Sequence, residues 1–204
     1  MKRERELELE RCVDFHGHLC GGLILGYQAA RLGLRRLRER FSPDEELVAV
    51  VDNDSCFADA VQALTGCTFG KGNFIFRDFG KMNLTLLSRG AGKGVRLSRK
   101  PTPSLDDEEF FGLFAKVSGG TASPAERRRL ERFKGARNRA LLAARPEDLF
   151  SVRPARLRIP GKARIRSSVP CGRCGEPTMS SRLVSRRGRR LCRECAPEAR
   201  ARLD

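Results

Sequence analysis

Apolar residues recur at alternating spacings of four and three after the segment FHGHLC, which spans residues 15–20. This spacing is typical of one face of a helix, and the Ser-Pro-Asp segment at 42–44 would end that helix. The pattern therefore predicts a long helix directly after FHGHLC. The residues on its apolar face are Leu23, Tyr27, Ala30, Leu34, Leu37 and Phe41.

A short apolar run, LVAVV at 47–51, predicts a buried strand. Asp54 or Ser55 can cap the helix expected in CFADAVQALTG, which closes on Gly66. Three β-prone segments follow at 74–79, 83–89 and 95–100, and glycine-containing turns separate them, which favours an antiparallel meander. We expect an α+β fold, with an antiparallel sheet of about four strands packed against the two helices.

Two further helices are expected after the loop at 101–107. The first is a helix or helical turn in EEFFGLFAKV, at 108–117. The second has Ser123 as N-cap, Pro124 in its first position and Glu126 completing a capping box. It carries few apolar residues and much arginine, so we expect it on the surface.

The C-terminal part contains two Cys-x-x-Cys pairs, CGRC and CREC, with seventeen residues between them. Two such pairs supply four thiolates in tetrahedral geometry, so they predict a closed, structural zinc site. We expect a hairpin that turns at Gly188 and a short helix in APEARARL, as in a treble-clef or ribbon zinc module. The predicted zinc ligands are Cys171, Cys174, Cys192 and Cys195.

The chain has 204 residues, of which 40% are hydrophobic, which is enough for one core and a small appendage. We expect a core domain at 1–150, a basic connector at 151–169 with a hairpin at its Pro-Gly step (160–161), and the zinc module at 170–204. The apolar stretches are too short to cross a membrane, and the opening MKRERELELER is too charged for a signal peptide. We therefore expect a cytoplasmic protein without membrane contact, whose cysteines bind metal or react instead of forming disulfides.

Positive charge is concentrated in the C-terminal part. The formal net charge is +16, and residues 151–204 hold 15 Lys and Arg against 4 Asp and Glu. This favours an anionic partner such as nucleic acid, an acidic protein or a phosphorylated ligand, although arginine-rich composition alone also produces such a charge. The same residues include no Phe, Tyr or Trp, which weakens the case for stacking on single strands.

The segment FHGHLC contains the only two histidines, His16 and His18. Cys20 and Cys56 each stand at a predicted helix N-terminus, where the helix dipole favours a thiolate and lowers its pKa. We expect both sulfurs to bind a second divalent metal together with one histidine, and we prefer His18 to His16 as that ligand. The metal would keep an open coordination position, and zinc is the first candidate. His16 would be a further ligand or a proton carrier. The alternative is that both cysteines are merely small buried residues at helix starts.

The segment TFGKGNF predicts a tight loop. Gly70 and Gly72 would bring backbone amides, together with Lys71, to the mouth of the pocket as a cradle for an anionic ligand group. A plain connection whose glycines only satisfy turn geometry is the alternative.

The segments FHGHLCGGLILGYQAA, VDNDSCFADAVQALTGCTFGKGN and FRDFGK, in this order, resemble the E-subunit family of formylmethanofuran dehydrogenase. The resemblance covers roughly residues 10–100, and the terminal cysteine pairs agree with it. Two departures are Gly21, where the family usually has proline, and Asp52, where it commonly has glutamate. The resemblance implies an α+β core, homodimers, a metal in the core pocket and association with a molybdenum or tungsten formylmethanofuran dehydrogenase. The residues that it places in or near the pocket are His16, His18, Cys20, Cys56, Asp59, Cys67 and Lys71.

Three functions remain open from the sequence. The first is a metal-binding accessory or redox-active protein of molybdenum- or tungsten-dependent one-carbon metabolism. The second is a stand-alone metal-dependent enzyme that uses Cys20, Cys56 and His16, with Asp54 or Asp59 as proton carrier. The third is a nucleic-acid-binding regulator that acts through the basic zinc module. Whether the chain is itself an enzyme or a component associated with an oxidoreductase stays open.

Overall fold

The computed structural model describes residues 2–102, 108–163, 166–186 and 188–196. The chain forms two compact units, Met1–Lys162 and Ala163–Asp204. Residues 151–162, expected in the connector, thus belong to the first unit. Among the described residues, none of the helices combines the length and apolar character needed to cross a membrane.

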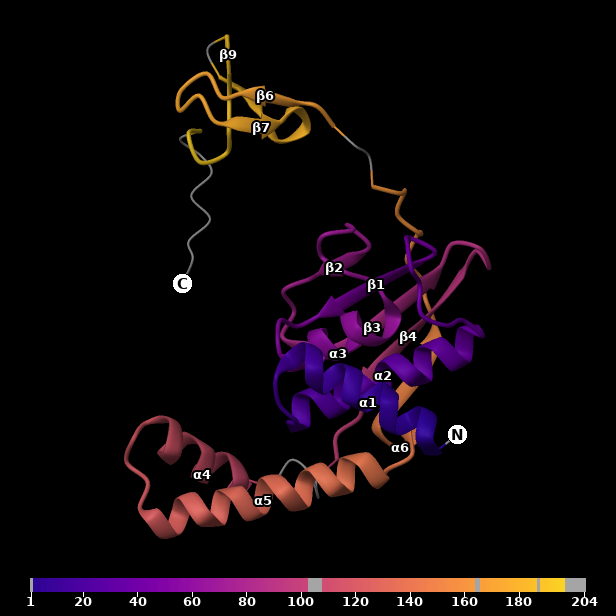
Figure 1. The fold of residues 1–204 in the computed structure, drawn as a ribbon, viewed down its shortest axis with the longest axis vertical. Coiled ribbons are helices and arrows are strands. Elements are labelled where there is room, and N and C mark those ends of the chain that lie inside the picture. The colour runs from indigo at the N-terminus through magenta and orange to yellow at the C-terminus, as the bar shows by residue number, and fades with distance from the viewer. Residues whose placement is uncertain (1, 103–107, 164–165, 187, 197–204) are drawn as a thin grey trace. The chain divides into compact units, whose positions relative to one another are not determined.

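A five-stranded open sheet forms the centre of the first unit (Figure 1). Its order is β2-β1-β3-β4-β5, in which β1 pairs with β2 in parallel and all other neighbours are antiparallel. The expected meander therefore holds for β3 and β4 but is wrong for β2, because the helix after β1 carries the chain back before β2 begins. The fifth strand was not expected at all. The strands are β1 (Leu47–Asp52), β2 (Phe74–Phe76), β3 (Lys81–Ser88), β4 (Lys93–Arg99) and β5 (Phe150–Pro154).

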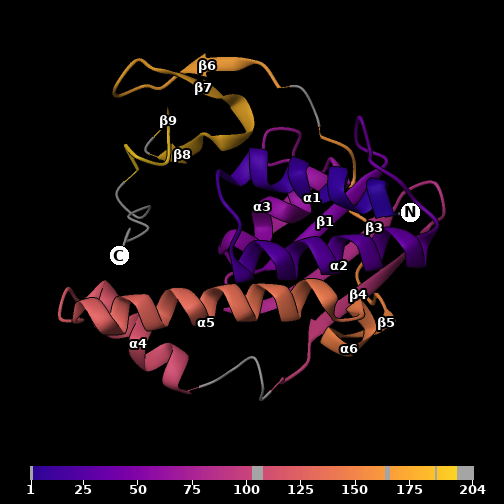
Figure 2. The ribbon, with the colours of Figure 1, turned by 60° about the horizontal axis from the view of Figure 1, so that its bottom comes forward.

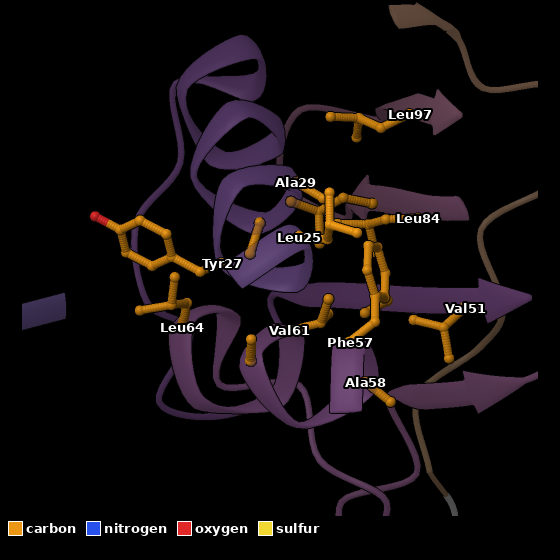
Figure 3. Packing of buried hydrophobic residues seen from close by; sticks show 14 of the residues in the cluster. Leu25, Tyr27, Ala29, Val51, Phe57, Ala58, Val61, Leu64, Leu84 and Leu97 are labelled. Atoms are coloured by element: carbon orange, nitrogen blue, oxygen red, sulfur yellow. The ribbon is translucent and has the colours of Figure 1, made fainter. Parts of the chain in front are cut away.

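The sheet buries apolar residues on both faces. On one face, Ala49 and Val51 of β1 join the main core, to which α2 (Gly21–Leu37) and α3 (Cys56–Thr65) contribute. Figure 3 shows Phe57 of α3 in this cluster, with side chains of α2 and the strands around it. The alternate residues, Val48 and Val50, form a smaller cluster on the other face, where Ala155, Leu157 and Ile159 cover them. Three residues of the expected basic connector therefore pack against the sheet.

The helix ends follow local capping rules. Ser55 is the N-cap of α3 and Gly66, with φ of 72°, is its C-cap, as expected from the sequence. The helix α2 ends earlier than expected, because Arg38 adopts a left-handed conformation with φ of 60°. A helix that the apolar pattern did not indicate, α1 (Lys2–His16), packs on α2 and α3, and its Cys12 is fully buried.

Two helices, α4 (Glu108–Ser118) and α5 (Pro124–Ala143), lie side by side (Figures 1 and 2). The capping box of Ser123 and Glu126 is present, and Pro124 begins α5, which confirms the expected start. The C-terminal half of α5 is attached to α2, because Gln28 donates to the carbonyl of Leu141 over 2.9 Å. A short helix, α6 (Pro146–Leu149), then leads into β5.

The described residues of the second unit form two small hairpins. The first joins β6 (Ser168–Pro170) to β7 (Pro177–Met179), and a 3-10 turn, η1 (Ser180–Arg182), follows it. The second hairpin joins β8 (Val184–Arg186) to β9 (Arg189–Leu191), and Gly188 in its turn has φ of 74°, as expected. The short helix expected in APEARARL falls largely on residues 197–204, outside the described residues.

Candidate metal centres

The first turns of α2 and α3 lie unusually close together because α2 presents glycines to α3. A Cβ at Gly26 would lie 2.2 Å from the carbonyl oxygen of Phe57, and one at Gly22 would lie 3.2 Å from the Cβ of Cys56. Any larger residue at Gly26 would force the helices apart. The glycines thus allow Cys56, the first residue of α3, to reach the N-terminus of α2.

Three donor atoms meet at this point. A ring nitrogen of His16 and the sulfurs of Cys20 and Cys56 all lie within 4.8 Å of one another. The Cys20 sulfur, at the N-cap of α2, accepts a hydrogen bond from the Leu23 amide and lies 3.8 Å from Nε2 of His16. The three side chains are half-buried, so solvent or a ligand can reach the cluster. One imidazole and two thiolates form a donor set that fits zinc.

His16, the last residue of α1, is the histidine that the structure brings to the cluster. Its Nδ1 lies 2.7 Å from a carboxylate oxygen of Asp59 on α3. A proton on Nδ1, donated to Asp59, leaves the lone pair of Nε2 on the side of Cys20. A carboxylate that holds the second nitrogen of a metal-bound histidine in this way fixes the ring and raises its basicity.

His18 lies outside the group of three, which corrects the order expected from the sequence. Its ring is 4.5 Å from that of His16, centroid to centroid, and the residue is exposed in the loop between α1 and α2. The apolar pattern predicted a helix only after FHGHLC, so both histidines were expected ahead of the first helix. Because α1 continues to His16, the two histidines do not share one face of an extended segment.

The pKa of Cys56 is raised, whereas the sequence argument expected a lowered value. Burial is the main cause, and the hydrogen bond and charge of the neighbouring Cys20 add to it. Desolvation and the second thiol thus outweigh the favourable end of α3. Two adjacent thiolates need a cation to offset their repulsion, and a bound divalent metal deprotonates a coordinating thiol.

Lys71 does not form the anion cradle expected from TFGKGNF. Its ammonium donates to three backbone carbonyls, those of Ser42, Pro43 and Asp44, at 3.1–3.2 Å. These bonds use all three of its donors. Gly72, with φ of 72°, satisfies the turn, and a Cβ at Gly70 would meet open space. The loop therefore fastens the segment before β1.

Two other residues named from the sequence lie outside the cluster. Cys67 is fully buried, and burial raises the pKa of its thiol to about 11. Asp54, considered as a proton carrier, is exposed in the loop between β1 and α3.

Asp52, a buried carboxylate at the end of β1, has a positioning role that was not predicted from the sequence. One of its oxygens accepts hydrogen bonds from Asn83 over 3.0 Å and from Arg96 over 2.7 Å. The next residue, Asn53, donates to the carbonyl of Lys81 and so ties the loop before Cys56 to β3. Together these bonds fix where α3 begins. A charged residue directly after the apolar run LVAVV was the available signal.

The second cluster is formed by the four cysteines of the C-terminal unit. Their sulfurs all lie within 4.8 Å of one another, with one pair in the turn between β6 and β7 and the other directly after β9. Backbone amides, that of Cys192 first, lower the pKa of Cys171 to about 6. In contrast, hydrogen bonding to the other thiols, Cys192 first, and burial raise the pKa of Cys195 to about 12. Without a cation, the four neighbouring thiols cannot all ionise. Such a set of four cysteines fits a closed zinc site.

Comparison with known proteins gives a matching family model and a curated relative. The sequence model described as "FmdE, Molybdenum formylmethanofuran dehydrogenase operon" matches residues 15–151. A probable S-adenosyl-L-methionine-binding protein of Archaeoglobus fulgidus is 31% identical over an alignment of 195 residues. The match covers 92% of this chain and 52% of that protein. The chain thus spans about half the length of this relative.

A solved structure shares the fold. It is that of a tungsten formylmethanofuran dehydrogenase FmdE-like protein from Syntrophus aciditrophicus, with a TM-score of 0.57 and 24% sequence identity. The match covers 94% of this chain and 91% of that one. Because the family model spans more than half of the chain, including both core cysteines and His16, the protein belongs to the FmdE family.

Proposed function

We propose that the protein is a metal-binding accessory protein of the FmdE type, with one divalent metal, zinc first, in the core pocket. The observation that carries this proposal is the convergence of His16, Cys20 and Cys56 from three helices, within 4.8 Å of one another. The Asp59 carboxylate, 2.7 Å from His16, supports it because it orients the imidazole.

The chemistry of the core site differs from that of the C-terminal cluster. Three protein donors leave a tetrahedral ion with one open coordination position. A metal bound here would hold a ligand at that position or act on it as a Lewis acid. Four cysteines close the coordination, so the zinc that we assign to the second unit is structural. We therefore assign function to the core site and fold stability to the C-terminal one.

We further propose that the protein assists molybdenum- or tungsten-dependent one-carbon metabolism in the cytoplasm, as a homodimer associated with a formylmethanofuran dehydrogenase. The name of the matching family model, which refers to the operon of the molybdenum enzyme, supports this role. The test is co-purification of a tagged chain with the dehydrogenase from a cell that holds both. An enzyme that purifies without the chain would contradict the association but not the metal site.

Metal content tests the core site. The intact protein should hold two ions per chain, and the Cys20→Ala, Cys56→Ala double variant should hold one. A matched pair separates the histidines, because His16→Ala should lose most of the core metal and His18→Ala should retain it. Two ions in the double variant would contradict the proposal.

A stand-alone enzyme is the second candidate, because the three-donor set leaves room for a substrate. The Archaeoglobus relative, named as a probable S-adenosyl-L-methionine-binding protein, suggests this compound as the first ligand to try. Equilibrium dialysis with the metal-loaded chain and with the double variant is the test. Binding of S-adenosyl-L-methionine that requires Cys20 and Cys56 would favour the enzyme. If this compound does not bind, the accessory role is the better supported function.

A further inference from the structure

The second unit presents a strongly basic surface that the core metal site does not use. Its described residues, 163, 166–186 and 188–196, include seven arginines against two glutamates, and all nine are exposed. The arginines are Arg166, Arg173, Arg182, Arg186, Arg189, Arg190 and Arg193. Such a surface attracts polyanions.

The register of the β8–β9 hairpin concentrates this charge. Arg186 lies directly opposite Arg189, and Arg190 lies opposite Ser185. Residues directly opposite in an antiparallel pair point to the same face, so Arg186 and Arg189 share one face and Arg190 points to the other. The hairpin therefore carries positive charge on both of its faces.

The second hairpin has a firm base and a charged tip. Cys192 follows β9 directly, and its amide donates to the Cys171 sulfur over 3.2 Å, which joins the hairpin to the other cysteine pair. The arginine pair Arg186 and Arg189 stands at the opposite end, beside the turn at Gly188. The cysteine cluster thus holds a short, twisted ribbon whose tip is cationic.

We propose that the β8–β9 hairpin binds double-stranded DNA through contacts of its arginines with the phosphate backbone. The major groove of B-form DNA, about 12 Å wide, admits a two-stranded β-ribbon, whereas the major groove of A-form RNA is too deep and narrow to be read. Single-stranded nucleic acid is bound largely by stacking on aromatic side chains, and residues 151–204 contain none. The chemistry of the hairpin therefore favours a duplex, without strong sequence preference.

The test uses the full, metal-loaded chain and a fluorescently labelled duplex of about 20 base pairs, whose anisotropy is followed between about 50 and 200 mM KCl. Each phosphate contact contributes about −0.9 to the slope of log K against log salt. The Arg186→Gln, Arg189→Gln variant should therefore lose about 2 from the magnitude of that slope and bind more weakly at every salt concentration. Neither arginine belongs to the group of four cysteines, so this variant should keep its cysteine-bound metal.

A control variant separates the hairpin from total charge. Arg127→Gln, Arg128→Gln removes two exposed arginines from α5 and should leave the slope unchanged. The Cys20→Ala, Cys56→Ala variant should also bind the duplex normally, which keeps this inference distinct from the core metal site. Equal losses in both arginine variants, tighter binding to the single strand or to polyglutamate, or no binding at the lowest salt would each overturn the proposal.

Discussion

Replacing Gly26 by alanine tests the close packing of α2 on α3. The added Cβ would lie 2.2 Å from the carbonyl oxygen of Phe57 and 2.9 Å from its Cα, where ordinary contacts are 3.4–4 Å. Those are backbone atoms, so the helices must separate by about 1 Å. Overpacking of a core costs about 1–3 kcal/mol, and alanine recovers about 1 kcal/mol of helix propensity. Backbone atoms cannot change rotamer to relieve the clash, so we expect the upper end of that cost. The free energy of unfolding should therefore fall by about 2 kcal/mol in net terms.

Urea unfolding followed by circular dichroism measures this loss. Gly112→Ala is the matched control, because a Cβ at this helical position of α4 would meet open space. It should leave stability unchanged or raise it by up to about 1 kcal/mol. Gly26→Ala should also reduce the metal content of the core, since separation of the helices moves Cys56 from Cys20. A Gly26→Ala protein as stable as the wild type would refute the packing argument.

Three further outcomes are expected. Asp59→Asn should weaken core metal binding by about 10–100-fold in a chelator competition, and unchanged affinity would exclude an orienting role for Asp59. A strong chelator should remove hydrogen-exchange protection from the second unit before the first, because so small a module depends on its metal to fold, and simultaneous loss would contradict this. Cys67 ionises near pH 9 when unfolded but near 11 when folded, so stability should fall as pH rises from 9 to 11. Cys67→Ala should flatten part of that fall, and an unchanged profile would argue against burial as its cause.

The sequence predicted the elements whose signals are local. The strand β1 is a continuous apolar run, α3 begins and ends at residues with recognised capping roles, and α5 begins at a capping box. The helix α1 could not be predicted in this way, because most of its residues are charged and only a few, Cys12 among them, meet the core. The parallel pairing of β1 with β2 follows from the path of the chain through α3, which no local pattern contains.

The core site was partly predictable for the same reason. Cys20 and Cys56 stand at helix N-termini, which capping residues reveal, but the choice of His16 over His18 depended on α1. Asp59 follows Cys56 by three positions, so both lie on neighbouring parts of one helical face, and that spacing was a readable signal. Lys71 was misjudged because its carbonyl partners come from a segment far away in the sequence.

The dependence of the core cluster on the glycine contact between α2 and α3 fixes the order of folding and metal uptake. In an unfolded chain His16 and Cys20 are near neighbours, but Cys56 is distant, and the entropy of loop closure opposes its joining them. Of the three core donors, an unfolded chain can therefore bring only His16 and Cys20 to a metal, and that complex should be weak. Metal should therefore bind to the core site only after α3 has packed on α2, when the first unit is already folded. In the second unit the two cysteines of each Cys-x-x-Cys pair are close in sequence, so there we expect the ion to bind first and the fold to follow.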